Sequence, residues 1–201
     1  PVGWIAGGET LTPIRLVKST DGGFSWFETP AGPFGTGTPQ VQFTSQTIGW
    51  LIVAKGIAEQ TLHRTTDGGD SWNLVLSTTS DTMFESMSFV NDLVGWVSTF
   101  PWYTMFRTRD GGETWDRLAT PAHLTSIQFL DSLVGWAAAS TGEVYCTTDG
   151  GETWALQKTG THSDLISVYA IDQNDVWVVG VRGTMLHSKD GGKNWNIQAE
   201  N

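Results

Sequence analysis

The sequence is poor in the residues that mark several common protein classes. It has one cysteine, Cys146, among 201 residues, so no disulfide can form within the chain. Lys and Arg number 11 against 21 Asp and Glu, and the net charge of −10 repels phosphate backbones, which argues against a nucleic-acid partner. No apolar run approaches the ~18 residues that a membrane-spanning helix needs, so we expect no membrane span.

Motifs that carry chemistry are also scarce. The four histidines are scattered, without the spacing of a metal site: His63, His123, His162 and His187. There is no glycine-rich phosphate loop before a helix and no G-x-S-x-G nucleophile elbow. No 11-residue window carries the apolar stripe of a helix. The sequence therefore predicts no metal, no cofactor, no catalytic residue and little helix.

Glycine and tryptophan are abundant, at 24 and 11 residues, and they belong to a repeat. The motif Ser/Thr-x-Asp-Gly-Gly-x-x-Trp occurs five times, at intervals of 39 to 46 residues. Its aspartates are Asp21, Asp67, Asp110, Asp149 and Asp190, and its tryptophans are Trp26, Trp72, Trp115, Trp154 and Trp195.

A second motif runs in phase with the first. It reads Gly3-Trp4, Gly49-Trp50, Gly95-Trp96, Gly135-Trp136 and, in degenerate form, Val176-Trp177. Seven residues before the last four of these tryptophans lie Phe43, Phe89, Phe129 and Ala170. Each unit of about 40 residues resolves into four short alternating stretches, as in 124–129, 135–139, 143–147 and 154–157, which is typical of a propeller blade.

We therefore predict an all-β fold, a single β-propeller domain over 1–201 with five four-stranded blades. The blade units are approximately 1–30, 38–77, 83–119, 123–159 and 164–199. The first unit starts at its second strand, so we expect its blade to lack the first strand. In each Asp-Gly-Gly turn the carboxylate accepts backbone N–H groups, the glycines permit positive φ, and the later Trp folds back under the turn.

The repeat is the Asp-box pattern S/T-x-D-x-G-x-S/T-W, from which only Asn194 departs. It resembles the boxes of sialidases, xyloglucan hydrolases and sortilin-type receptors. With the Phe and Gly-Trp positions included, nearly the whole chain resembles the photosystem II stability and assembly factor family and its non-photosynthetic bacterial relatives. The resemblance implies a propeller, of which five repeats would be a compact relative or a fragment. Each box offers one Asp, too few for a calcium loop, so we expect a structural role.

The position three residues before each box Asp is partly basic. It holds Lys18, Arg64, Arg107, Cys146 and His187, with Arg109 and Lys189 close by in the sequence. The resemblance implies an arginine-rich patch that contacts a partner, which makes Arg64, Arg107 and Arg109 candidate binding residues. The alternative is that these side chains lie between blades, with packed stems and solvated heads.

Loops at the face opposite the Asp boxes supply the other candidates. The segment 99–103 carries Phe100, Trp102 and Tyr103, and exposed aromatic rings with a polar edge are good anchors for proteins or sugars. The alternative is a loop packed over its blade. Comparable loops hold Glu59, His123, His162 and Arg182, which we also predict as contacts.

Three functions follow from these patterns. We expect a non-catalytic scaffold that binds a protein partner, as the resembled assembly-factor family does for photosystem II. A carbohydrate-binding lectin that reads sugars with Trp102 is the alternative. A glycoside hydrolase is a third, but Glu9, Glu59, Glu85 and Glu143 show no paired spacing, and no arginine lies in the Arg-Ile-Pro setting of sialidases. Because Asp-box families are usually exported, we expect a secreted, periplasmic or lumenal location.

Overall fold

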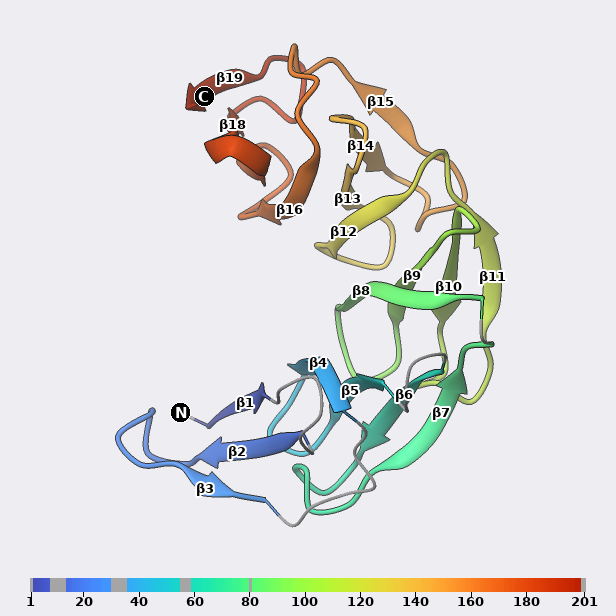
Figure 1. Ribbon diagram of the computed structural model, residues 1–201, viewed down its shortest axis with the longest axis vertical. Helices are drawn as coiled ribbons and strands as arrows, with labels where there is room; N and C mark the ends of the chain where they lie inside the picture. The colour runs from blue at the N-terminus through green and yellow to red at the C-terminus, as the bar shows by residue number, and fades with distance from the viewer. Residues whose placement is uncertain (1, 8–13, 30–35, 55–58, 80, 200–201) are drawn as a thin grey trace. The chain divides into compact units, whose positions relative to one another are not determined.

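The computed structural model describes residues 2–7, 14–29, 36–54, 59–79 and 81–199. In this part of the chain the structure is almost entirely strand, arranged in five antiparallel sheets that follow one another along the sequence (Figure 1). The described residues contain one short 3₁₀ turn, η1 (Val181–Gly183), and no helix long and apolar enough to cross a membrane.

Each sheet is one repeat unit. The first has three strands, β1 (Gly3–Gly7), β2 (Arg15–Ser19) and β3 (Phe27–Glu28). The second has β4 (Thr36–Phe43), β5 (Gly49–Ala54), β6 (Gln60–Thr65) and β7 (Asn73–Ser77). The third has β8 (Met83–Phe89), β9 (Gly95–Phe100), β10 (Thr104–Thr108) and β11 (Asp116–Ala119). The fourth has β12 (Leu124–Phe129), β13 (Gly135–Ala139), β14 (Val144–Thr147) and β15 (Ala155–Gln157). The fifth has β16 (Leu165–Ala170), β17 (Val176–Gly180), β18 (Met185–Ser188) and β19 (Asn196–Ala199).

This architecture confirms the predicted all-β propeller of repeated blades. The Gly-Trp dipeptides, replaced by Val176-Trp177 in the fifth sheet, begin the second strand of each four-stranded sheet, and each Asp box there joins the third strand to the fourth. In the first sheet, as predicted, the Gly-Trp strand β1 lies at the edge of the order β1-β2-β3.

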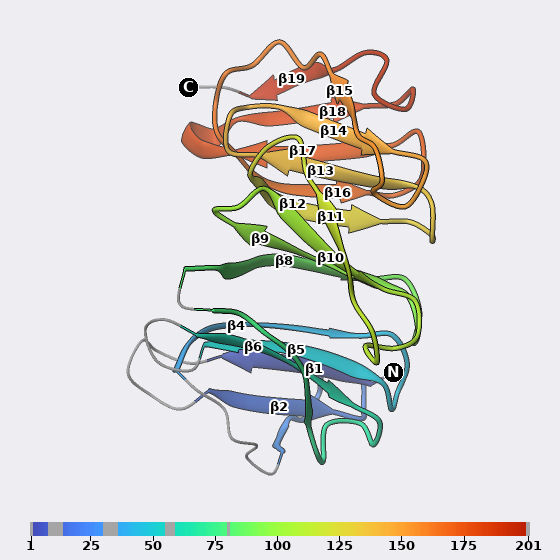
Figure 2. The ribbon, with the colours of Figure 1, turned by 90° about the vertical axis from the view of Figure 1, so that its right-hand side faces the viewer.

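The chain forms two compact units. The first consists of Pro1–Phe84, Asn91–Leu93 and Asp110–Thr114, and the second of Glu85–Val90, Val94–Arg109 and Trp115–Asn201. The first unit contains the first two sheets, and the second contains most of the third sheet with the fourth and fifth. Within each sheet the strands run antiparallel with turns at both ends (Figure 2).

The recurring Phe and Gly-Trp positions form a cross-strand pair. Phe129 lies opposite Gly135 in the β12–β13 register, and a Cβ on Gly135 would lie 2.6 Å from the Phe129 ring. Phe43 covers Gly49 in the same way, since a Cβ on Gly49 would lie 2.5 Å from the Phe43 ring. Glycine is therefore needed because the ring occupies the space of its side chain. In the fifth sheet the same pair is Ala170 opposite Val176, so a smaller residue leaves room for a larger one.

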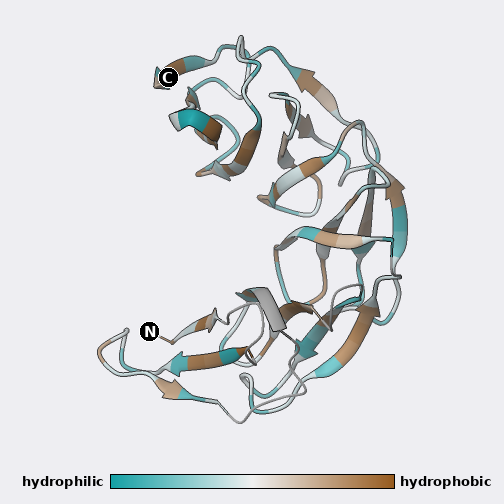
Figure 3. Cartoon of the chain, in the orientation of Figure 1, coloured by the Kyte–Doolittle hydropathy of each residue, from teal (hydrophilic) through white to brown (hydrophobic). Residues whose placement is uncertain are grey.

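The tryptophan of the Gly-Trp dipeptide packs between sheets. Trp96 stacks on Phe129 of the following sheet, with ring centroids 3.6 Å apart and planes 2° apart. Trp4 stacks on Phe43 with ring centroids 3.6 Å apart and planes 6° apart. Trp50, Trp96 and Trp136 are at most 1% exposed, whereas hydrophilic residues prevail in most turns (Figure 3). The core therefore lies at the contacts between successive sheets.

The Asp-box tryptophans are less buried than this inner set. Trp154 is partly buried and meets Phe129 edge-on at 5.9 Å, while Trp26 is 40% exposed. The Trp26 Nε1–H donates to Gly23 O at 3.1 Å, which is the folding-back under the turn expected from the sequence.

The Asp-box carboxylates are occupied within their own turns. Asp149 Oδ1 accepts the Thr153 N–H at 2.9 Å and the Thr147 hydroxyl at 2.8 Å, and Oδ2 accepts the Thr153 hydroxyl at 2.6 Å. Gly150 and Gly151 have φ of 74° and 88°, which the turn requires of glycine. In the first box the hydroxyl and N–H of Ser25 lower the pKa of Asp21 to about 2. These contacts hold the turn and leave the charged form favoured.

Candidate functional site

In the second unit, the loops at the strand ends opposite the Asp boxes contact one another in series. Thr120 N–H donates to Tyr103 O at 2.8 Å, and Ser140 N–H donates to His123 O at 3.3 Å. Val181 N–H donates to Asp164 O at 2.9 Å. We call this series the loop band, and its members are residues 100–103, 120–123, 140–142, 158–164 and 181–183. The Thr159 hydroxyl donates to Gly142 O at 3.3 Å, so the series of contacts runs over three sheets.

Three aromatic side chains stand at one end of the loop band. Phe100, Trp102 and Tyr103 are 37%, 53% and 54% exposed. The Phe100 ring lies 4.6 Å from the ring of His123, and Thr120 ties down the Tyr103 backbone. The structure therefore presents the predicted anchors on the surface, on a turn attached to the next sheet.

His123 links this aromatic turn to its neighbours. Its Nε2 lies 3.4 Å from Glu85 Oε1, and its Nδ1 lies 3.2 Å from the Ser140 hydroxyl. The structure thus brings together two residues predicted as separate contacts, Phe100 and His123. Glu85, which the sequence suggested only as an unpaired acid, is their third member.

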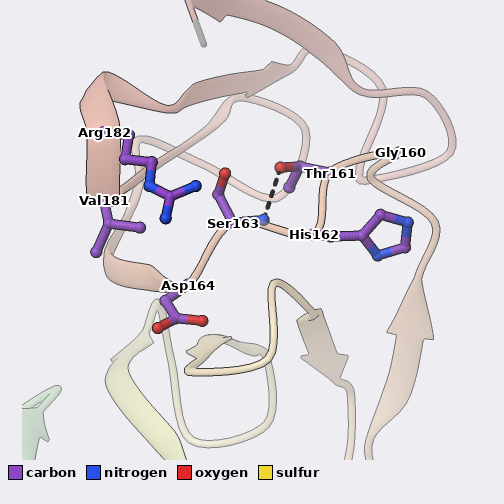
Figure 4. A pocket seen from close by; sticks show the side chains of 7 residues that line it. All are labelled: Gly160, Thr161, His162, Ser163, Asp164, Val181 and Arg182. Atoms are coloured by element: carbon purple, nitrogen blue, oxygen red, sulfur yellow. Dashed lines mark hydrogen bonds between the residues drawn. The ribbon is translucent and has the colours of Figure 1, made fainter. Parts of the chain in front are cut away.

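A pocket of about 370 Å³ lies at the other end of the band (Figure 4). It is lined by Gly160, Thr161, His162, Ser163, Asp164, Val181 and Arg182. Two predicted contacts, His162 and Arg182, therefore share one site. Figure 4 shows the Arg182 guanidinium directed towards the Ser163 hydroxyl, while the His162 ring and the Asp164 carboxylate point elsewhere. Sequence reasoning missed Thr161, Ser163 and Asp164.

Glu143, one of the remaining acidic candidates, is engaged in hydrogen bonds within its own sheet. Glu143 Oε2 accepts the hydroxyls of Thr141 at 2.6 Å and Tyr145 at 2.9 Å. Burial and the nearby Glu143 raise the pKa of Tyr145 to about 12. Glu59 lies in the first unit directly before β6, and Glu9 lies outside the described residues. Among the described residues, no group of three or more His, Cys, Asp or Glu could hold a metal ion.

The basic side chains before the Asp boxes reach carbonyls of the following repeat. Arg107 Nη1 donates to Gly150 O at 3.1 Å, and its Nη2 lies 2.6 Å from Glu152 Oε1. The Trp96 indole N–H donates to the same Gly150 O at 2.9 Å. In the first unit Trp4 and Lys18 meet Gly68 O in the same way, at 3.2 Å and 3.1 Å. Lys18 and Arg107 therefore make contacts between repeats, whereas His187 pairs with Asp175 of its own sheet at 2.8 Å.

Burial separates the three arginines that were predicted as binding residues. The Arg107 side chain is 5% exposed, while Arg109 is exposed and pairs with Asp116 at 3.1 Å. Arg64 Nη2 donates to Asp92 O at 3.4 Å, above the Trp50 ring. At the fourth position burial raises the pKa of the Cys146 thiol. Of these three arginines, Arg109 offers the most accessible guanidinium, which already lies next to the carboxylates of Asp116 and Glu152.

The comparisons with known proteins agree with this architecture. The family model of the photosynthesis system II assembly factor YCF48 matches residues 33–161 and 118–200. No sequence among the curated proteins matches the chain.

Solved structures share the fold at low identity. YCF48 bound to D1 peptide superposes with a TM-score of 0.73 and 21% identity, over 98% of this chain and 63% of that one. YCF48 from Cyanidioschyzon merolae superposes with a TM-score of 0.63 and 20% identity, over 98% of this chain and 60% of that one. The GH74 enzyme of Niastella koreensis superposes with a TM-score of 0.75 and 17% identity, over 99% of this chain and 36% of that one. This chain thus spans less than two thirds of each of these proteins.

The enzyme neighbour shows that the shared fold alone does not decide between binding and catalysis. The family is decided by the sequence model, whose two matches together run over 33–200 and so cover most of the chain. The Phe, Gly-Trp and Asp-box positions that build the contacts between sheets lie within this range from Phe43 onward. The chain belongs to the photosynthesis system II assembly factor YCF48 family.

Proposed function

We propose that this chain is a non-catalytic scaffold that binds a segment of a protein partner on the loop band. The observation that carries the proposal is the exposed aromatic turn of Phe100, Trp102 and Tyr103, held in place by Thr120 and His123. Large aromatic rings on a fixed turn lose little conformational entropy on binding, and such residues dominate the binding energy of protein interfaces.

The comparisons support a protein partner. One fold neighbour is described as YCF48 bound to D1 peptide, and the family is that of an assembly factor. We propose by analogy that this chain assists the assembly or stability of a membrane or envelope complex, from an extracytoplasmic compartment. The analogy rests on fold and family, and the partner itself is to be identified by experiment.

The test is affinity capture from a membrane and envelope extract of the source organism, followed by mass spectrometry. Wild type is compared with a Trp102→Ala/Tyr103→Ala variant and with Phe24→Ala. Phe24 is 94% exposed and lies in an Asp-box turn of the first unit, so it is a matched control for loss of exposed aromatic surface. We expect a discrete set of proteins that the control retains and the double variant loses.

Other results would point to other functions. Retention of the same proteins by the double variant contradicts binding through the aromatic turn. Capture of polysaccharide alone favours the lectin, for which Trp102 offers an exposed ring. Turnover of aryl glycosides that is lost on changing one glutamate, Glu85 or Glu143, contradicts the non-catalytic assignment.

A further inference from the structure

We propose that the pocket at the far end of the loop band is a carboxylate-binding subsite in which Arg182 is the main ligand. The inference rests on the proposed function, because it names the chemistry by which a partner segment would be recognised. The carboxylate belongs either to an Asp or Glu side chain or to the C-terminus of the segment. Both sources offer the same planar pair of oxygens to the guanidinium.

The backbone of Arg182 is strained. It has φ 56° and ψ 28°, the left-handed region that non-glycine residues seldom adopt. The next residue is Gly183, which has φ 76° and meets no such penalty. Backbone strain of this kind is concentrated at ligand sites. The strain at Arg182, beside a glycine that has none, therefore points to a binding role for the guanidinium.

The Arg182 guanidinium differs from those of the ion-paired arginines in its surroundings. The arginines that form ion pairs among the described residues are Arg15, Arg107 and Arg109, each with a carboxylate of this chain. Arg182 is exposed. Among the described residues it forms no ion pair, not even with Asp164 of the same pocket. Figure 4 shows Arg182 facing the hydroxyl of Ser163, with the Asp164 carboxylate directed away. The guanidinium is thus available to an external anion.

The pocket walls are fixed by close backbone contacts. A Cβ on Gly180 would lie 2.5 Å from Asp164 O, and one on Gly142 would lie 3.0 Å from Ser163 O. Val181 N–H donates to Asp164 O at 2.9 Å, and Ser163 N–H donates to the Thr161 hydroxyl at 3.1 Å. Because the backbone at Ser163 and Asp164 contacts the backbone of both neighbouring loops, the site is preorganised. Binding would therefore lose little conformational entropy from loop ordering.

Size and charge select a single carboxylate over a phosphate. The volume of about 370 Å³ is near the lower end of ligand pockets, which run from ~300 to ~1,000 Å³, and suits one side chain or chain end. One guanidinium with hydroxyl groups matches one negative charge. A dianion would be opposed by Asp164 at the rim and by the net charge of −10.

The test is an NMR titration of the whole chain with two defined carboxylates. N-acetyl-glutamate with an amidated C-terminus represents the side-chain source, and N-acetyl-trialanine with a free C-terminus represents the chain end. Their amide counterparts, with glutamine or a C-terminal amide, are the controls. Wild type is compared with Arg182→Gly and Arg182→Lys. Glycine relieves the positive φ, so the Arg182→Gly variant should melt no lower than wild type.

We expect saturable shifts of the Arg182 side-chain N–H and of the Thr161 and Ser163 amides with at least one carboxylate. Arg182→Gly should weaken this binding at least tenfold, and Arg182→Lys should weaken it less, because lysine keeps the charge without the bidentate geometry. Equal binding of the amide counterparts, or unchanged binding by Arg182→Gly, overturns the inference. The carboxylate that binds more tightly identifies the source.

The outcome is independent of the capture experiment. Carboxylate binding at Arg182 with unchanged capture by the Trp102→Ala/Tyr103→Ala variant would preserve the subsite and reject the aromatic turn. Loss of capture in that variant without any carboxylate binding would preserve the proposed scaffold and reject the subsite.

Discussion

At the scale of single residues, the motif glycines are explained by the rings that cover them. Gly135 sits opposite Phe129, whose ring would lie 2.6 Å from an added Cβ. That ring also stacks on Trp96 at 3.6 Å, so it cannot move aside without giving up a contact between sheets. The glycine is thus required by packing, with no positive φ involved.

This packing predicts the effect of Gly135→Ala. We expect a loss of about 1–3 kcal/mol in the free energy of unfolding from overpacking, and about 3–5 kcal/mol for Phe129→Ala from the lost ring. The double variant should cost less than the sum, because removal of the ring makes room for the methyl group. Urea denaturation measures all three.

Gly7→Ala is the matched control for this series. A Cβ on Gly7 would meet no atom within 4 Å, so its effect should stay within about 0.5 kcal/mol. Additive costs of Gly135→Ala and Phe129→Ala would show that the pair does not determine the packing at this position.

At the scale of elements, successive sheets are joined by a repeated polar contact. Trp96 and Arg107 both donate to Gly150 O, and Arg107 is also close to Glu152 and Asp116. At the next junction Cys146 stands where the basic residue was. There the Trp136 indole nitrogen is buried without a hydrogen-bond partner among the described residues. The junctions of one chain are therefore not equivalent.

Arg107 and Arg109 give a direct test of this contact. We expect Arg107→Ala to lower the free energy of unfolding by about 1–3 kcal/mol, because a buried, charge-assisted hydrogen bond is lost. Arg109→Ala removes an exposed pair and should cost at most about 1 kcal/mol. The two unfolding midpoints in urea compare them. Equal costs would mean that the Gly150 contact contributes little.

At the scale of the whole molecule, the repeated Asp boxes couple stability to acid. The pKa of Asp21 is lowered to about 2 by Ser25, and those of Asp67, Asp149 and Asp190 are also lowered in the folded chain. Each carboxylate binds a proton more readily when unfolded. Their stabilising contribution is therefore complete above the unfolded pKa of about 4 and is lost as the pH falls through the folded values.

We therefore expect the melting temperature to fall steadily as the pH is lowered from about 4 to 2, from the four boxes together. An Asp67→Asn variant should show a shallower fall, since it has one fewer titrating box. Thermal melts followed by tryptophan fluorescence measure this. A melting temperature that is level across this range would contradict the role of the boxes, and strong suppression by added salt would point to ion pairs instead of hydrogen bonds.

The sequence predicted the blades well because each is a local repeat with its own turn chemistry. It predicted Phe100 and His123, and also His162 and Arg182, as separate contacts. The loops of His162 and Arg182 meet through close backbone approaches at Gly142 and Gly180, and Phe100 meets His123 through a ring contact between sheets, neither of which a local pattern reveals. It also could not separate the buried Arg107, three residues before its box Asp, from the exposed Arg109 two residues later, because spacing alone does not predict burial.

The pairing of Ala170 with Val176 has a consequence for recognising such proteins. In this blade both halves of the Phe and Gly signature have changed together, and the strands keep their register. The register of these two strands therefore does not require a phenylalanine facing a glycine, and two side chains of intermediate volume fill the same place. A search for the Phe and Gly-Trp signature alone would pass over this blade, which the family model matches within residues 118–200. Scoring the two positions jointly, by their combined side-chain volume, should recover such blades. It would then raise the number of repeats counted in chains whose Gly-Trp dipeptide has changed.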